Sequence, residues 1–182
     1  MNILVYLGSS EGNKKYFKEA ALEVADWICD HNYGLVYGAN RYGLMGILAN
    51  RVLERNCEVT GVIPKFLLKT EIPHENLTNY IEVETMQERK DYMRSISNIC
   101  IALPGGPGTL EEITEAISLY RVNQSDNICV FYNKEGYYNP IKKMYDDMLR
   151  YGFINEEDRK NIIFVDDIRN LDNELDNFRI KK

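Results

Sequence analysis

The chain has 182 residues, of which 45% are hydrophobic, and its formal net charge is −6. No basic block interrupts this acidic balance, so the composition excludes a protein that binds along a nucleic-acid backbone. The first ten residues contain a short apolar run without a basic flank or a long hydrophobic segment, and we therefore expect neither a signal peptide nor a membrane span.

The chain is long enough to bury one sizeable core, and no linker-like stretch divides it, so we expect a single domain over residues 1–182. Its four cysteines lie far apart and form no CxxC pair. We expect them to be buried, reduced thiols in a cytoplasmic protein and not metal ligands: Cys29, Cys57, Cys100 and Cys129.

Short β-rich runs alternate along the chain with longer segments of helical periodicity. The sequence predicts strands at residues 2–7, 34–38, 58–63, 80–84, 99–104, 127–132 and 161–165. It predicts helices at residues 16–28, 44–53, 86–97, 109–120 and 141–149, and a surface helix with a frayed end in the polar tail from about 166. This alternation is typical of an α/β fold, a Rossmann-like doubly wound parallel sheet with helices on both faces.

Ligands bind to such a sheet beyond the carboxyl ends of the strands, where the strand order reverses. The loops at residues 8–12, 37–46 and 104–109 follow predicted strands and carry several small residues. We therefore expect the functional site among these three loops.

The loop "PGGPGT" at residues 104–109 combines three glycines with a helix that we expect to begin at Thr109. Free backbone N–H groups at the positive end of a helix, with no Cβ atoms in the way, bind phosphate. The spacing differs from GxGxxG and from GxxxxGK[ST], which favours a monophosphate over magnesium-dependent triphosphate chemistry. The alternative is a tight turn whose glycines only satisfy backbone geometry.

Glu112 lies on the first turn of that predicted helix and allows two interpretations. Thr109 and Glu112 match a capping box, in which the glutamate returns to the amide of the N-cap residue. On a helical wheel, the main apolar stripe faces one way, while Glu112 lies nearly opposite, beside Ala116 and Leu119. We therefore expect a subunit interface along Ala116 and Leu119, with Glu112 at its edge.

Arg89 occupies a position that the helical pattern reserves for an apolar residue, because it shares a stripe with Met86, Met93 and Ile96. A guanidinium on the buried side of a helix must find an anion, which could be Glu112, another carboxylate or a bound phosphate. The alternative is an arginine that extends to solvent from a partly exposed helix.

Taken together, these stretches resemble the LOG family, the cytokinin riboside 5'-monophosphate phosphoribohydrolases formerly described as lysine decarboxylase-like. The stretch "PGGPGTLEE" is similar to the family's PGGxGTxxE, "MQERKDYM" to MxxRKxxM, and "LVYGANRYGLMG" to VYGGGxxGLMG. The shorter motifs "GVIP", "EGYYNP" and "YGFI" follow the family's order. A true decarboxylase would need a Schiff-base lysine within a larger fold.

The resemblance implies a homodimer that hydrolyses the N-glycosidic bond of a purine nucleoside 5'-monophosphate, with adenine or N6-prenylated adenine as the base. The products would be the free base and ribose 5-phosphate, and no metal or other cofactor would be required. Arg89 and Glu112 match the family's catalytic pair. The expected substrate-binding residues are Gly8, Ser9, Glu71, Lys90, Gly105, Gly106, Pro107, Gly108, Thr109, Leu110, Glu111 and Ser118.

Four residues depart from the family's pattern: Ala39, Asn40, Gln87 and Leu119. The first two stand where the family has glycines, so they add side chains to a turn that is otherwise bare. These differences leave open which base the protein accepts.

The expected mechanism starts from the charge that develops when a purine leaves ribose. The sugar becomes positive, as in glycoside hydrolysis. A carboxylate near C1' would stabilise that charge or deprotonate the attacking water, and we assign this role to Glu112. Arg89 would hold ribose or phosphate and keep Glu112 ionised.

A non-catalytic carrier or sensor, similar to the molybdenum-cofactor carrier proteins, is the alternative interpretation. It would explain the glycine-rich loop without requiring Arg89 and Glu112 together. A dehydrogenase is less favoured, because the first turn, "LGSSEG", lacks the GxGxxG arrangement that binds a dinucleotide.

Overall fold

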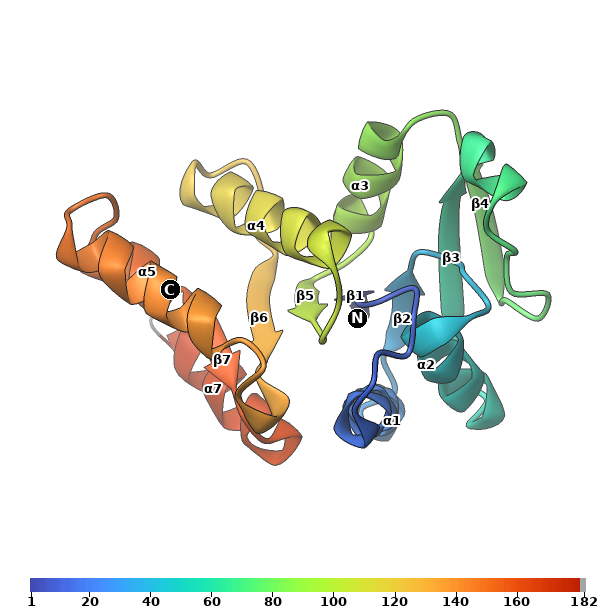
Figure 1. The fold of residues 1–182 in the computed structure, drawn as a ribbon, viewed down its shortest axis with the longest axis horizontal. Coiled ribbons are helices and arrows are strands. Elements are labelled where there is room, and N and C mark those ends of the chain that lie inside the picture. Colours follow the sequence, from blue (N-terminus) through green and yellow to red (C-terminus); the bar gives the residue numbers. More distant parts are fainter. Residues whose placement is uncertain (181–182) are drawn as a thin grey trace.

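One parallel sheet organises the protein in the computed structural model, which describes residues 1–180 (Figure 1). The strands are β1 (Asn2–Tyr6), β2 (Gly34–Tyr37), β3 (Val59–Pro64), β4 (Asn79–Val83), β5 (Ile99–Ala102), β6 (Ile128–Tyr132) and β7 (Ile162–Val165). Their order across the sheet is β4-β3-β2-β1-β5-β6-β7, and each neighbouring pair is parallel. The predicted doubly wound α/β fold is thereby confirmed.

The helices form a layer on each face of this sheet. They are α1 (Lys15–Asp30), α2 (Gly43–Glu54), α3 (Met86–Ser95), α4 (Pro107–Arg121), α5 (Asn139–Arg150), α6 (Glu156–Lys160) and α7 (Leu171–Ile180). Short 3-10 helices are η1 (Lys65–Lys69), η2 (Lys134–Gly136) and η3 (Ile168–Asn170). Helices α3, α4 and α5 cover one face, and α1, α2 and α7 cover the other (Figure 1). Each predicted helix is present, whereas α6 and the 3-10 helices were not predicted.

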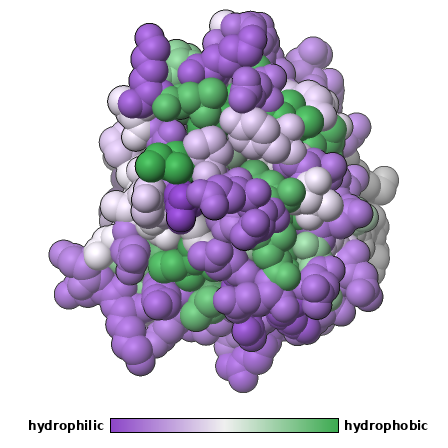
Figure 2. Space-filling model, turned by 90° about the vertical axis from the view of Figure 1, so that its right-hand side faces the viewer, coloured by the Kyte–Doolittle hydropathy of each residue, from purple (hydrophilic) through white to green (hydrophobic). Residues whose placement is uncertain are grey.

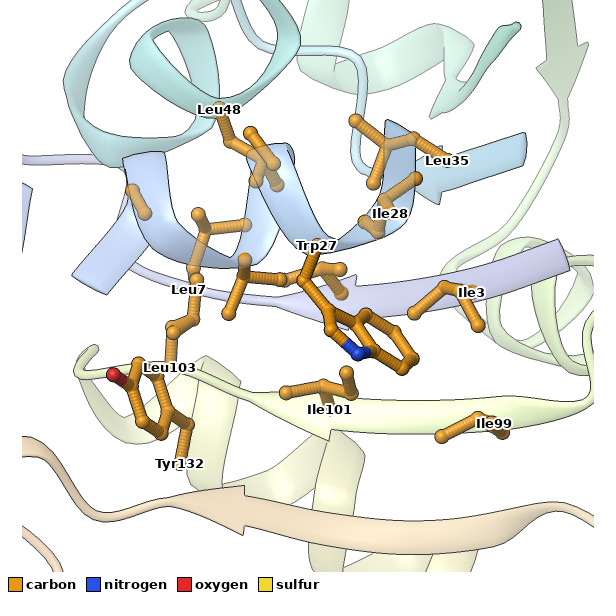
Figure 3. Close-up of a cluster of buried hydrophobic side chains, with 14 of the residues drawn as sticks. Ile3, Leu7, Trp27, Ile28, Leu35, Leu48, Ile99, Ile101, Leu103 and Tyr132 are labelled. Atoms are coloured by element: carbon orange, nitrogen blue, oxygen red, sulfur yellow. The ribbon is translucent and has the colours of Figure 1, made fainter. Parts of the chain in front are cut away.

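Each face of the sheet contributes to a separate hydrophobic cluster, because successive side chains of a strand point to opposite faces. On β1, Ile3 and Val5 belong to the cluster under α1 and α2, while Leu4 and Tyr6 belong to the cluster under α3, α4 and α5. Figure 3 shows Trp27 directed from α1 toward the sheet residues of the first cluster. This double burial explains why the strands are apolar at consecutive positions.

The polar tail packs more closely than the sequence suggested. Leu171, Leu175 and Phe178 of α7 are buried in the first cluster, and Trp27 Nε1 donates a hydrogen bond to Asp172 Oδ1 at 3.0 Å. Three apolar residues at helical spacing are enough to pack α7 against the first cluster, although the rest of the helix is polar. The last residues of the expected frayed end, 181–182, lie outside the described part of the chain.

The outer surface is mainly hydrophilic on the side that carries β4, where hydrophobic side chains form separate patches (Figure 2). Within residues 1–180, no helix combines the length and the apolar character that crossing a bilayer requires.

Candidate active site

The strand order reverses between β1 and β5, and the loops that follow these two strands lie against each other. Gly8 N donates a hydrogen bond to Pro104 O at 3.3 Å. A Cβ added to Gly105 would lie 2.1 Å from Thr109 Oγ1 and 3.0 Å from Gly8 N, so a larger residue would clash with the Thr109 side chain and crowd the loop of Gly8. The predicted location of the site, at the reversal of the sheet, therefore holds a close contact between two loops, in which glycine at position 105 leaves room for Thr109.

A cleft of about 420 Å³ opens beside this contact. It is lined by Leu7, Gly8, Ser9, Met45, Phe66, Leu67, Glu71, Met86, Arg89, Gly106, Pro107, Gly108, Thr109, Glu111 and Glu112. The fold thus brings the expected catalytic pair together with most of the expected substrate-binding residues. Met45, Phe66 and Leu67 form an apolar wall of the cleft. Met45 lies in the predicted site loop at residues 37–46, and Met86 lies on the stripe that it shares with Arg89, whereas nothing in the sequence marked Phe66 and Leu67 as part of the site.

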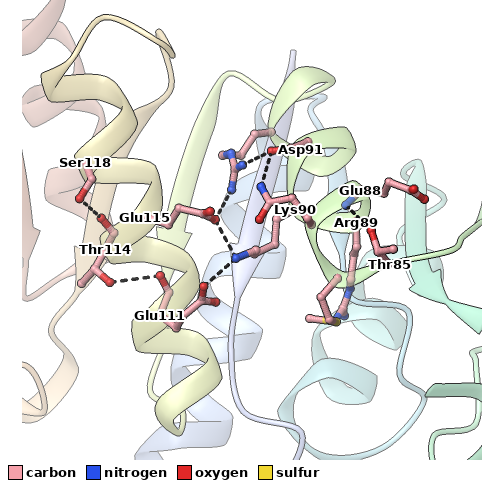
Figure 4. Close-up of polar contacts among 12 residues, drawn as sticks. Thr85, Glu88, Arg89, Lys90, Asp91, Glu111, Thr114, Glu115 and Ser118 are labelled. Atoms are coloured by element: carbon pink, nitrogen blue, oxygen red, sulfur yellow. Dashed lines mark hydrogen bonds and ion pairs between the residues drawn. The ribbon is translucent and has the colours of Figure 1, made fainter. Parts of the chain in front are cut away.

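Four expected substrate-binding residues do not line the cleft. Lys90 Nζ is bound by Glu111 Oε1 at 2.6 Å and by Glu115 Oε2 at 3.1 Å, both on α4. Figure 4 shows Lys90 reaching toward these carboxylates, whereas Arg89 points away from them. The other three lie elsewhere: Gly105 lines a smaller cavity of about 200 Å³, Leu110 lines an apolar groove beside α5, and Ser118 is exposed.

Helix α4 begins at Pro107 with Gly106 as its N-cap, two residues earlier than predicted. Thr109 is therefore inside the first turn, and the capping box proposed for Thr109 and Glu112 is not formed. The fixed φ of proline suits the first helical position, which explains the earlier start. Glu112 therefore does not have the helix-capping role that the sequence allowed.

The glycines of this loop have different physical roles. A Cβ added to Gly106 or Gly108 would meet no atom within 4 Å, and neither residue has a positive φ. Within residues 1–180, the N–H groups of Gly106, Gly108 and Thr109 donate to no protein acceptor. A turn requirement therefore does not account for Gly106 and Gly108.

Arg89 is only 5% exposed, as its place on the apolar stripe predicted, so it does not extend to solvent. Its Nε donates to Val62 O and its Nη2 to Gly38 O, both at 3.0 Å, and Nη1 lies 3.8 Å from Met86 Sδ. Among the described residues, no carboxylate lies within ion-pair distance of this guanidinium. The protein thus leaves a buried positive charge without an anionic partner, directly on the cleft.

Glu112 is 9% exposed and lies on the same cleft. Burial raises the pKa of Glu112 to about 7, and the attraction of Arg89 opposes this shift without cancelling it. Arg89 thus favours the ionised form of Glu112, as expected, but burial has the larger effect on the pKa of this carboxyl group.

The expected subunit interface along Ala116 and Leu119 is wrong for Ala116. Ala116 belongs to the core cluster beneath α4, so the chain itself covers it. Ile113 and Ile117 of the main apolar stripe are buried as expected, and Glu112 is buried as well, so the buried side of α4 is wider than that stripe.

The residues that depart from the family's turn do not reach the cleft. Ala39 is fully buried and has a φ of 64°, a conformation that favours glycine, which explains why glycine is usual at this position. Asn40 Oδ1 accepts a hydrogen bond from Tyr42 N at 2.9 Å. Both side chains therefore shape the turn and not the surface that a ligand would contact.

Comparisons with known proteins place this site in a family. A family model described as "Possible lysine decarboxylase" matches residues 45–175. The cytokinin riboside 5'-monophosphate phosphoribohydrolase LOG1 of Arabidopsis thaliana is 38% identical over 176 residues, which are 97% of this chain and 83% of the relative. The probable enzyme of the same name, LOGL1, from Oryza sativa subsp. japonica is 39% identical over 161 residues, 88% of this chain and 72% of the relative.

Similar solved structures include the molybdenum cofactor carrier protein of Chlamydomonas reinhardtii, with a TM-score of 0.71, 16% identity, and coverage of 100% of this chain and 98% of the other. The molybdenum cofactor binding protein of Rippkaea orientalis has a TM-score of 0.67 at 16% identity and covers 97% and 96%. Likeness at this identity concerns the fold alone, whereas the sequence relationship covers nearly the whole chain. The chain belongs to the LOG family of cytokinin riboside 5'-monophosphate phosphoribohydrolases.

Proposed function

We propose that the protein hydrolyses the N-glycosidic bond of purine nucleoside 5'-monophosphates, with adenine or N6-prenylated adenine as the base, and releases the free base and ribose 5-phosphate. One observation carries the proposal: Arg89, which is buried without a carboxylate partner among the described residues, and Glu112, with a pKa of about 7, line the same cleft as the glycine-rich start of α4. The names of the relatives support it, since they describe this reaction on cytokinin riboside 5'-monophosphates.

The cleft suggests how the substrate lies. The phosphate would accept hydrogen bonds from the free N–H groups of Gly106, Gly108 and Thr109 at the start of α4. Glu71 Oε2 is buried and has no hydrogen-bond partner in the described part of the chain, so it is available to a sugar hydroxyl. The apolar wall around Phe66 would then receive the base.

Binding the phosphate would hold the sugar in place between Arg89 and Glu112. Ionised Glu112 would stabilise the positive charge on the sugar or take a proton from the attacking water. The water oxygen bonds to C1', the C1'–N bond breaks, and its electron pair leaves with the base, which takes up a proton. A pKa near 7 suits a group that accepts and returns a proton at neutral pH.

The test is chromatography of the purified protein after incubation with AMP, its N6-isopentenyl derivative, GMP and CMP. We expect free base from the adenine nucleotides with the wild type, and at most a trace with Glu112→Gln, which should still bind nucleotide. If the wild type binds these nucleotides and releases no base, the enzyme assignment is wrong and a carrier role replaces it.

We also propose that the protein forms a homodimer. An apolar groove of about 430 Å³ between α4 and α5 is lined by Leu110, Met144 and Met148, and it shares Pro107 and Glu111 with the cleft. A second copy bound in this groove would cover Met144, which is 55% exposed, and the half-buried Met148 next to the site. Sedimentation of the wild type and of Met144→Lys tests this, with a dimer expected for the first and a monomer for the second.

The proposed setting is the cytoplasm, with the chain acting as a single domain. Cys29, Cys57, Cys100 and Cys129 are all free thiols, which supports a reducing compartment. Leu110 and Ser118 lie outside the chain's own cleft and stay predictions as substrate contacts.

A further inference from the structure

Two adjacent tyrosines from the "EGYYNP" stretch donate hydrogen bonds to carbonyl groups of the glycine-rich loop. The hydroxyl of Tyr138 donates to Leu103 O at 2.6 Å, and the hydroxyl of Tyr137 donates to Gly105 O at 2.6 Å. Between them, Pro104 O accepts from Gly8 N. Three consecutive carbonyl groups of the loop are thus each bound by a donor from outside it.

The bond from Tyr137 determines where the next amide points. The chain has no cis peptide bond in the described residues, and in a trans peptide the N–H of Gly106 is directed opposite to the C=O of Gly105. Gly106 lines both the cleft and the smaller cavity, whereas Tyr137 lines the smaller cavity and is not among the residues of the cleft. Holding Gly105 O on the side of Tyr137 therefore turns the Gly106 N–H away from Tyr137, which leaves the cleft as the side that it faces.

The peptide unit between Gly105 and Gly106 needs the hydrogen bond from Tyr137 because it has glycine on both sides. Gly105 and Gly106 lack the Cβ atoms that restrict rotation elsewhere, so the unit between them turns over at little cost. Turned over, it would present a carbonyl oxygen to the cleft in place of an N–H group. A carbonyl oxygen repels phosphate, and the anion would also lose one donor.

Hydrogen bonds and ring contacts position the two tyrosines. Tyr138 N donates to Asn133 Oδ1 at 2.6 Å, and Asn133 Nδ2 donates to Asp166 Oδ1 at 2.7 Å. The ring of Tyr138 packs edge-on against Phe131 with centroids 4.9 Å apart, and that of Tyr137 packs against Phe17 at 5.5 Å. Tyr138 is thus buried and held through its backbone and its ring, whereas Tyr137 is 37% exposed and is positioned by its ring contact.

We propose that Tyr137 and Tyr138 are positioning residues of the phosphate site: Tyr137 keeps the Gly105–Gly106 amide directed at the anion, Tyr138 holds the carbonyl of Leu103 at the start of the loop, and neither touches the anion. This rests on the proposed function only in requiring a ligand that carries a phosphate group. Loss of either tyrosine hydroxyl should weaken the binding of ligands that carry a phosphate group and leave the binding of ligands without one unchanged.

The experiment compares Tyr137→Phe with the wild type by calorimetry, using ribose 5-phosphate, AMP and adenosine as ligands. We expect the affinity for ribose 5-phosphate and for AMP to fall about 5- to 10-fold, the ratio that one hydrogen bond supplies, with adenosine unchanged. KM for AMP should rise by the same factor, with kcat within about twofold. Tyr138→Phe should show the same selectivity together with a lower melting temperature, since it leaves a buried carbonyl unpaired.

Tyr33→Phe is the matched control, because Tyr33 lies just before β2 at the opposite end of the strands and is expected to change none of these values. Unchanged ribose 5-phosphate affinity in Tyr137→Phe, or an equal loss for adenosine, would overturn the inference. So would a wild type that does not bind ribose 5-phosphate. If the wild type releases no base from any nucleotide while the selective loss is still seen, the proposed reaction fails and the positioning role stands.

Discussion

Gly38 and Arg89 fit each other at the centre of the site. Arg89 Nη2 donates to Gly38 O at 3.0 Å, and a Cβ added to residue 38 would lie 1.9 Å from that same nitrogen. Because Gly38 has no side chain, it leaves room for the guanidinium of Arg89, although 51 residues separate the two in sequence.

Gly38→Ala should displace Arg89 without unfolding the protein. A shift of about 1 Å at a catalytic group costs about 10²-fold in rate, so we expect kcat/KM for AMP to fall by about that factor. Steady-state kinetics measures the loss, and circular dichroism verifies the fold. Activity within threefold of the wild type would show that the position of Arg89 is not critical.

Gly108→Ala should have opposite effects on stability and on binding. Alanine is favoured over glycine within a helix, and the added Cβ meets no protein atom, so the free energy of unfolding should rise by about 0.5 kcal/mol. The same methyl group would occupy the space of the phosphate and weaken AMP binding about tenfold. Urea titration and calorimetry measure the two effects. Unchanged AMP affinity in this variant would mean that the phosphate binds elsewhere.

The pH dependence of kcat/KM should follow the ionisation of Glu112. Since the proposed mechanism uses the carboxylate form, and burial raises its pKa to about 7, the rate should rise with pH and level off above about 7. The profile is recorded with AMP between pH 5 and pH 9, with Tyr33→Phe as the control for a surface change. A rate that instead decreases across this range would assign Glu112 the role of an acid.

The stability of the protein should depend on pH through the same residue. The folded state binds the Glu112 proton more tightly than the unfolded state, whose pKa is near 4.5. Its stabilising contribution is complete below pH 4.5 and is lost as the pH rises through about 7, by up to about 3 kcal/mol.

Glu112→Gln removes this dependence, because glutamine does not ionise. The variant should therefore gain stability relative to the wild type as the pH increases from 5 to 8, as measured by urea unfolding at each pH. Parallel curves for the two proteins would show that Glu112 ionises normally in the folded state.

The sequence by itself determined the layers of this protein and the identity of its reactive groups. Consecutive apolar positions in the strands, the helical stripes between them and the Arg89 position on one stripe depend on local periodicity, which is legible without the fold. The glycine-rich stretch at residues 104–109 likewise marked a loop that lines the cleft.

Only the tertiary structure decided how these groups are paired and charged. The partners of Arg89 are carbonyl groups of Val62 and Gly38, which no spacing in the sequence connects. The pKa of Glu112 depends on how much water the packed layers remove from its carboxyl group, and the loops of Gly8 and Pro104 meet only because β1 and β5 are neighbours in the sheet. Burial and long-range contact are properties of the assembled layers, so local pattern locates the residues while packing sets their chemistry.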